Sequence, residues 1–203
     1  MYLEGVGDGP AFVKQAARVT RKKPVVAIKV GRSEHGRAAV ASHTGALACR
    51  DAAYNAAFRK AGVIRAESTE EVFDWARALA WSPLPAGRRM AVLTNAGGPG
   101  AIAVDALDAN GLTMASLTET SQAKLRELLP AAASVRNPVD MLAAAGAYEY
   151  ANALRLLLMD EGVDGAMVIL APPPMTTAAG IAGAIIPMVR SAAKPVVVTL
   201  MGE

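Results

Sequence analysis

The sequence is short of the residues that build disulfide-linked or metal-bound frameworks. Its 203 residues include a single cysteine, Cys49, and only two histidines, His35 and His43. One cysteine excludes a disulfide framework, and so few thiols and imidazoles exclude a cysteine–histidine metal cluster. We therefore predict no metal site, and a lone reduced thiol fits a cytoplasmic protein.

Aromatic residues and net charge are also scarce. Aromatics make up 4% of the chain, whereas 53% of its residues are apolar, so the core relies on aliphatic and alanine packing and disorder is not expected. The net charge is only +3, and the densest basic cluster, at 18–23, is interpreted as a solvated helix end. Nucleic-acid binding, which needs a stronger basic patch, is not predicted.

No segment has the pattern of a signal peptide or a membrane span. The opening residues MYLEGVGDGP lack a basic segment followed by an apolar run. Residues 165–189 carry no charge, but the prolines at 172–174 interrupt them. A buried strand, a loop and a helix explain this stretch better than a membrane-spanning helix does.

Short apolar runs alternate with helical patterns along the chain. Runs typical of buried parallel strands lie at 24–30, 90–95, 165–170 and 195–200. Helical patterns lie at 45–61, 68–80, 121–129 and 180–192. The first of these helices has an apolar face made of Leu47, Tyr54, Phe58 and Ala61, and Gly62 stands at its C-cap position. Ser68 and Glu71 form a capping box at the start of the second.

Repeated strand–loop–helix units predict an α/β fold with open parallel sheets covered by helices. The segment 81–89 contains two prolines, a glycine and two arginines and breaks this pattern. We predict a first domain at 1–82, a linker at 83–88 and a second domain at 89–203. Because the opening MYLEG already resembles the end of a strand, we expect the first domain to be incomplete and the chain to be a piece of a longer protein.

His43 lies in the most informative segment. Between the strand at 24–30 and the next helix, GRSEHGRAAVASHTG (31–45) is rich in glycine, serine and arginine and is predicted to be a loop. Ligands of open α/β sheets bind in such loops, beyond the carboxyl ends of the strands. His43 could act there as an acid, a base or a covalent carrier, or it could only cap the helix or face solvent; spacing alone leaves these open. His35 is expected to be exposed.

A second candidate site follows the strand at 90–95. In TNAGGPG (94–100), three glycines would let backbone N–H groups approach a ligand at the positive end of a helix. This arrangement predicts a phosphate-sized anion site, although the glycines could instead serve only a tight strand–helix turn. Neither a dinucleotide fingerprint nor a P-loop is present.

Two further features have a weaker meaning by themselves. Glu4 follows an expected strand end, and beside a histidine it could accept the Nδ1 proton and leave Nε2 as the nucleophile. NPVDM (137–141) is a turn signal.

In this order the segments resemble the NDP-forming acyl-CoA synthetases, relatives of succinyl-CoA synthetase. The resemblance covers nearly the whole chain and rests on YLEG, KVGRSEHGRAAVASHTGALA, DAAYNAAFRKAGVIRAESTEEVFD, TNAGGPGAIAVDAL and NPVDM. It implies two flavodoxin-like domains of the succinyl-CoA synthetase type. It also implies an enzyme that reversibly converts acyl-CoA, phosphate and NDP to acid, CoA and NTP through an acyl phosphate and a phosphohistidine.

The resemblance implies roles for individual residues. His43 would carry the phosphoryl group, Glu4 would pair with it, and the helix start in TNAGGPG would face it. The implied phosphate-binding residues are Ser42, Thr44, Gly45, Asn95, Gly97, Gly98 and Gly100. The only group bound covalently would be the transient phosphate on His43, and no metal is implied in this chain.

The family's CoA-binding Rossmann domain and its ATP-grasp domain with a Mg-nucleotide site are not visible in this sequence. The expected partners are therefore phosphate or acyl phosphate and those two domains of the parent protein, and we expect this chain alone to be inactive. Self-association is left open. A competing reading is a ligand-sensing domain of an acyl-CoA-synthetase-like protein acetyltransferase, which the retention of His43 with Glu4 argues against. A third hypothesis is a domain that binds a flavin phosphate. The scarcity of aromatic residues argues against it, because flavin rings usually stack on tryptophan or tyrosine.

Overall fold

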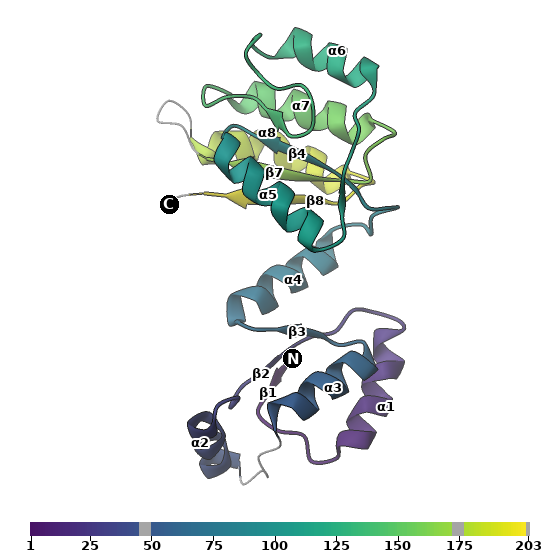
Figure 1. Ribbon diagram of the computed structural model, residues 1–203, viewed down its shortest axis with the longest axis vertical. Coiled ribbons are helices and arrows are strands. Elements are labelled where there is room, and N and C mark those ends of the chain that lie inside the picture. Colours follow the sequence, from purple (N-terminus) through teal and green to yellow (C-terminus); the bar gives the residue numbers. More distant parts are fainter. Residues whose placement is uncertain (45–49, 172–176, 202–203) are drawn as a thin grey trace. The chain divides into compact units, whose positions relative to one another are not determined.

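The computed structural model describes residues 1–44, 50–171 and 177–201, with only the backbone of His43 and Thr44. The chain divides into two compact units, Met1–Trp81 and Ser82–Glu203. Each unit contains its own sheet of parallel strands with helices packed against it (Figure 1). The predicted α/β class with two parallel sheets is confirmed.

The sheet of the first unit has three strands in the order β1–β2–β3. Their bounds are β1 Tyr2–Leu3, β2 Val26–Lys29 and β3 Ile64–Ala66. Leu3 lies opposite Lys29, and Ile28 lies opposite Ala66, so all three strands end at the same edge. The strand predicted at 24–30 is β2.

Four helices belong to the first unit. They are α1 Gly9–Thr20, α2 Glu34–Thr44, α3 Asp51–Ala61 and α4 Thr69–Trp81. Helices α1 and α3 pack together, and the predicted apolar face of α3 is buried at Tyr54, Phe58 and Ala61. Gly62 adopts the left-handed conformation, with φ of 68°, as expected of a C-cap glycine. Leu47, assigned to the same face, lies outside the described residues.

The sheet of the second unit is also parallel, in the order β5–β4–β7–β8, with β6 pairing β4 as well. Its strands are β4 Arg89–Thr94, β5 Thr113–Met114, β6 Val139–Asp140, β7 Gly165–Leu170 and β8 Val196–Leu200. Strands β4 and β7 are almost entirely buried, as predicted for the runs at 90–95 and 165–170.

Helices cover both faces of this second sheet (Figure 1). They are α5 Gly97–Ala109, α6 Glu119–Leu128, α7 Ala147–Met159 and α8 Ala178–Ser191. Along β4, Val92 packs with Leu107 of α5, whereas Leu93 belongs to the larger cluster that contains Leu154 of α7 and Ile181 of α8. This alternation follows from the opposite directions of successive side chains in a strand.

The uncharged stretch 165–189 forms two separate elements. Residues 165–170 are β7, and α8 begins at Ala178 with its N-terminus capped by the Thr177 hydroxyl, which accepts from the Gly180 N–H. Residues 172–176, between them, lie outside the described part of the chain. No helix within the described residues has the length and apolar character needed to cross a membrane.

Strand β8 differs from the prediction for 195–200. Only Val196 of this strand is buried, whereas Val198 and Leu200 are 45% and 50% exposed. The apolar composition is that of a buried strand, but β8 pairs with β7 alone within the described sheet. The prediction of a buried strand was therefore wrong here. An apolar pattern describes the side chains of one segment, whereas burial also depends on the elements that pack beside that segment.

One ion pair fixes the beginning of β4. The Asp164 carboxylate accepts hydrogen bonds from the backbone N–H and Nε of Arg89 at 2.9 Å each, and from its Nη2 at 2.7 Å. These bonds to Arg89 lower the pKa of Asp164 to about 2. An ordinary aspartate has a pKa of about 4. The ionised carboxylate therefore stabilises the fold above about pH 4, and this contribution is lost as the pH falls towards 2.

We predict that Asp164→Asn lowers the unfolding temperature at pH 7, because the charged partner of Arg89 is lost. The difference from the wild type should shrink between about pH 4 and pH 2, as measured by thermal unfolding across that range. Asp74→Asn, which removes the exposed partner of Arg77, is the control and should change little. A difference that stays constant down to pH 2 would contradict the assignment.

Candidate functional site

The carboxyl edge of the first sheet collects the predicted carrier segment and its predicted partner. Glu4 comes directly after β1 and is half-buried. The segment that leads to His43 leaves the neighbouring strand β2, where the Val30 N–H donates to the Leu3 carbonyl at 3.1 Å. Because β1 and β2 pair in parallel, Glu4 and the segment that leads to His43 both begin at the same edge of the sheet. Open α/β sheets bind ligands at this edge.

The segment 31–45 is not the loop that its glycine and serine content predicted. Helix α2 occupies Glu34–Thr44. The Ser33 hydroxyl accepts from the Gly36 N–H at 3.1 Å, which is the bond of an N-cap residue. The alanines that follow have the highest helix propensity of any residue, and this outweighs the single glycine.

The Ser-His-Thr-Gly motif therefore stands at the C-terminal end of a helix. The backbone of His43 lies in the last turn of α2, and the side chains of His43 and Thr44, with all of Gly45, lie outside the described residues. Ser42 is exposed, and its hydroxyl donates to the Ala39 carbonyl at 2.7 Å. His35 lies in the first turn of the same helix and is exposed, as predicted.

Helix α3 begins later than the pattern indicated. Its first residue is Asp51, whereas the helix was predicted from Gly45; residues 45–49 lie outside the described part. No described residue of α2 is buried, in contrast to the three buried residues of α3. The described part of α2 is therefore more loosely packed on its unit than α3 is.

The second predicted site lies where β4 passes into α5. Ala96 is the N-cap of α5 and offers no side-chain cap, whereas α1, α6 and α8 are each capped by a side-chain oxygen. An uncapped helix start has backbone N–H groups available to another acceptor, and it carries the positive end of the helix dipole. This is the geometry that anions use at helix termini.

The three glycines of this turn do not serve the same purpose. A Cβ at Gly100 would lie 3.1 Å from Thr94 Cγ2, a tight contact, so the close packing of α5 on β4 favours glycine at this position. A Cβ at Gly98 would meet nothing within 4 Å, and at Gly97 only an Asp140 oxygen at 3.4 Å. Packing explains Gly100 and leaves Gly97 and Gly98 without an internal reason, which favours a ligand at this helix start.

The side chain of Asn95 is committed to the protein itself. Asn95 is 3% exposed, its Nδ2 donates to the Ala171 carbonyl at 2.7 Å, and its Oδ1 accepts from the Ala171 N–H at 2.9 Å. This amide ties the end of β4 to the end of β7. Asn95 is thereby placed to position the glycine turn, and its side chain would have to break both bonds to contact a phosphate.

The segment NPVDM (137–141), predicted to be a turn, contributes two polar side chains to this edge of the second sheet. The Asn137 amide accepts from the Val92 N–H at 2.8 Å and donates to the carbonyls of Met90 and Ala115 at 2.7 and 3.0 Å. It thereby fills the gap along β4 between its pairing with β5 and with β6. Asp140, at the end of β6, stands beside Gly97 and accepts from the Leu142 N–H at 3.0 Å.

The buried tyrosine of α7 lies under the same edge. Tyr150 is fully buried and its hydroxyl donates to the Ile169 carbonyl at 2.9 Å. Burial, reinforced by the negative charge of Asp140, raises the pKa of Tyr150, so it remains a neutral donor. Among the described residues, no three or more histidine, cysteine, aspartate or glutamate side chains gather as a metal site would require.

Two α/β units with parallel sheets, each with a motif at a carboxyl strand edge, place the chain in the open-sheet α/β class, whose members bind ligands at such edges. Residues 1–79 match the succinyl-CoA-ligase-like flavodoxin domain, and residues 90–203 match the ligase-CoA domain. The chain belongs to the family of these CoA ligases, as the sequence motifs indicated.

Relatives with established names support this assignment. The chain is 46% identical, over 85% of its length and 38% of the relative's, to the acetate–CoA ligase [ADP-forming] II subunit alpha of Pyrococcus furiosus. It is 46% identical, over 85% of its length and 25% of the relative's, to the acetate–CoA ligase [ADP-forming] I of Archaeoglobus fulgidus. The chain thus spans well under half the length of these relatives.

A solved structure extends the comparison to the fold. The dinucleotide-forming acetyl-coenzyme A synthetase 1 of Candidatus Korarchaeum cryptofilum, in complex with phosphate and ADP, superposes with a TM-score of 0.87 and 37% identity. The match covers 100% of this chain and 44% of that one. Both parallel sheets therefore belong to a fold that a related synthetase also adopts.

We predict opposite effects of alanine at two of the glycines. Gly100→Ala should lower the free energy of unfolding by about 1–3 kcal/mol, because the new Cβ presses on buried Thr94. Gly98→Ala should leave it unchanged or raise it by up to about 1 kcal/mol, because the methyl group enters open space and alanine favours the helix. Urea unfolding of the two variants measures the contrast, and equal destabilisation would contradict it.

Proposed function

We propose that the chain is the phosphohistidine-carrying part of an ADP-forming acyl-CoA synthetase. The complete enzyme interconverts acyl-CoA, phosphate and ADP with a carboxylic acid, CoA and ATP. The observation that carries this proposal is the position of His43 in the last turn of α2, an unburied helix that starts at the same strand edge as Glu4. The names of the relatives support ADP as the nucleotide and a small acid such as acetate as the substrate.

The reaction divides into three balanced transfers. Phosphate attacks the thioester carbon, the C–S bond breaks, and CoA leaves as the thiol with acyl phosphate as the product. His43 Nε2 then attacks the phosphorus of the acyl phosphate, a P–N bond forms, and the carboxylate leaves with the P–O bonding electrons. Finally a terminal oxygen of ADP attacks the same phosphorus, the P–N bond breaks, and ATP forms with free imidazole.

Glu4 is proposed to hold the imidazole in the reactive form. A carboxylate that accepts the Nδ1 proton fixes the tautomer and leaves the Nε2 lone pair for phosphorus. It also stabilises the positive charge that the ring acquires when phosphorylated at Nε2. The half-buried position of Glu4 after β1 suits this function, because partial exclusion of water strengthens the interaction.

The start of α5 is proposed to bind the phosphoryl group. Phosphate would accept hydrogen bonds from the backbone N–H groups of Gly97 and Gly98, which have room for it because neither position carries a Cβ. Asp140 lies beside Gly97, and its negative charge would limit how long a phosphate dianion stays there. A site that must release phosphoryl groups as well as bind them benefits from such a balance.

The CoA-binding and nucleotide-binding parts of the enzyme are proposed to lie in other domains or subunits, and we place the enzyme in the cytoplasm with its substrates. The phosphohistidine must then pass its phosphoryl group to ADP bound elsewhere. This proposal accounts for the short span of the chain relative to the ligases that it resembles.

The carrier assignment predicts the fate of a radioactive label. When the complete ligase is incubated with acyl-CoA and labelled phosphate, wild type should gain acid-labile label, and His43→Ala should gain none because the only nucleophilic nitrogen of the motif is lost. His35→Ala is the matched control, since His35 lies on the same helix and is exposed, and it should be labelled like wild type. Acid-labile label on the His43→Ala protein would contradict the proposal.

The partner assignment predicts a slower but measurable reaction. Glu4→Gln should reduce the rate of phosphohistidine formation by about ten- to ten-thousand-fold, because the amide cannot stabilise the imidazolium that forms. Single-turnover labelling of the complete ligase measures the rate. Glu34→Gln, an exposed glutamate at the start of α2, serves as the control. A wild-type rate for Glu4→Gln would remove Glu4 from the mechanism.

A further inference from the structure

We propose that four charged residues at the carboxyl edge of the first sheet position the segment 33–50, which carries His43. We call this group, which comprises Arg32, Asp51, Arg65 and Glu67, the ionic clasp. The inference rests on the proposed function, because it assigns to these residues the task of presenting the phosphohistidine. All four are positioning residues and none is assigned a contact with substrate.

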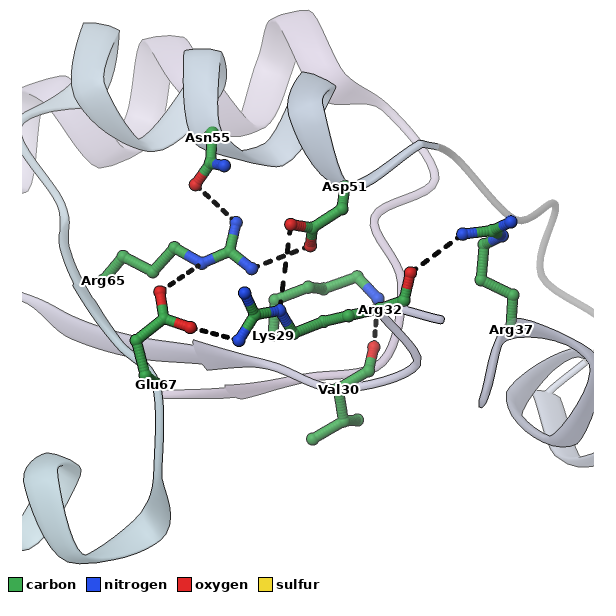
Figure 2. A network of polar contacts seen from close by, with 8 residues as sticks. All are labelled: Lys29, Val30, Arg32, Arg37, Asp51, Asn55, Arg65 and Glu67. Atoms are coloured by element: carbon green, nitrogen blue, oxygen red, sulfur yellow. Dashed lines mark hydrogen bonds and ion pairs between the residues drawn. The ribbon is translucent and has the colours of Figure 1, made fainter. Parts of the chain in front are cut away.

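The inner half of the clasp is centred on Arg65. Arg65 is the central residue of β3, and its side chain is 10% exposed. Nη2 donates to Asp51 Oδ1 at 2.7 Å, Nη1 donates to Asn55 Oδ1 at 2.5 Å, and Nε lies 3.5 Å from Glu67 Oε1 (Figure 2). A guanidinium shared in this way fixes the first turn of α3 on the sheet.

The outer half is Arg32, which is 46% exposed. Its Nη1 contacts Glu67 Oε2, and its Nε lies 3.8 Å from Asp51 Oδ2 (Figure 2). The Arg32 carbonyl in turn accepts from Nη1 of Arg37, a residue of α2, at 2.8 Å. The chain of contacts therefore runs from β3 through Arg32 into the helix that ends at the motif.

The clasp joins the two ends of the carrier segment. Arg32 immediately precedes residues 33–50 and Asp51 immediately follows them, and the Asp51 carboxylate contacts both Arg32 and Arg65. Without the clasp, the nearest anchors in the core would be Lys29 on β2 and Tyr54 on α3, both of which are buried. The clasp therefore adds a contact at the two residues that border the segment.

Helix α2 needs such an anchor because its own packing is slight. Its described residues are all exposed or half-buried, and its close contact with the chain before it is made at Gly31, which has a φ of 71°. A Cβ at Gly31 would lie 2.9 Å from Val40 Cγ2 and 3.2 Å from the Gly36 carbonyl oxygen. The described contacts that position α2 thus lie at its entry.

Loss of the Arg32 side chain should affect the rate of phosphoryl transfer and the stability of the unit to different extents. Exposed ion pairs contribute little to the free energy of unfolding, so loss of the Arg32 side chain should leave the unit folded. Misplacement of a reacting group by about 1 Å, in contrast, can slow a reaction by about a hundredfold. A positioning residue at this site should therefore change phosphoryl transfer much more than it changes the unfolding temperature.

The test compares three variants in the complete ligase. Arg32→Met should slow phosphohistidine formation by about tenfold or more, and Arg32→Lys, which keeps the charge but can replace only one of the two contacts, should be slowed less than Arg32→Met. Arg77→Met breaks an exposed ion pair on α4 and should match wild type. Hydrogen exchange in residues 33–50 should be faster in Arg32→Met alone, while all three unfolding temperatures agree.

The outcomes separate the clasp from the function on which it rests. If Arg32→Met forms phosphohistidine as fast as Arg77→Met while His43→Ala remains unlabelled, the clasp is overturned and the proposed function stands. If Arg32→Lys is slowed as much as Arg32→Met, the charge-based clasp is also overturned. Acid-labile label on the His43→Ala protein overturns the proposed function itself, whatever the Arg32 variants show.

Discussion

Parallel pairing of the strands is the constraint on which both candidate sites depend. In a parallel sheet every strand ends at the same edge, so segments that are distant in sequence begin from one place. In the first unit this brings together Glu4 after β1, Arg32 after β2 and Glu67 after β3. In the second unit Asn95 after β4 meets Ala171 after β7 in the same way. These residues are neighbours because of the sheet topology, and their local sequences do not indicate it.

Helix polarity then decides what each edge can bind. The described part of helix α2 ends at Thr44, so the backbone of His43 lies at the negative end of the helix dipole. Helix α5 begins at its motif and presents the positive end, with room at Gly97 and Gly98. The two helices therefore differ in the charge that their dipoles place at the respective motif.

Much of the fold could be predicted from local patterns, and the failures have physical causes. Strands β4 and β7 and the C-cap at Gly62 follow from composition and periodicity, which are properties of the segment itself. Helix α7 was not predicted although its buried residues have helical spacing, and its N-cap residue is Gly146, which has no side chain to signal a helix start. The exposure of β8 depends on what pairs beside it. The ionic clasp joins Arg65 to Asp51 and Arg32 to Glu67, and no periodic pattern marks such contacts between separate elements.

Two of the departures from local rules lie at the motifs. An alanine-rich helix of 11 residues with no buried described side chain should be marginal by itself, and α2 is held by the Ser33 cap, the Gly31 turn and Arg37. A helix start without a side-chain cap and with two glycines that packing does not require costs stability as well, and α5 has both. Natural sequences keep such exceptions mainly where function needs them. The combination at α5, two adjacent glycines with room beside them at an uncapped helix start, is what agrees with a functional interpretation of the Gly-Gly-Pro-Gly motif.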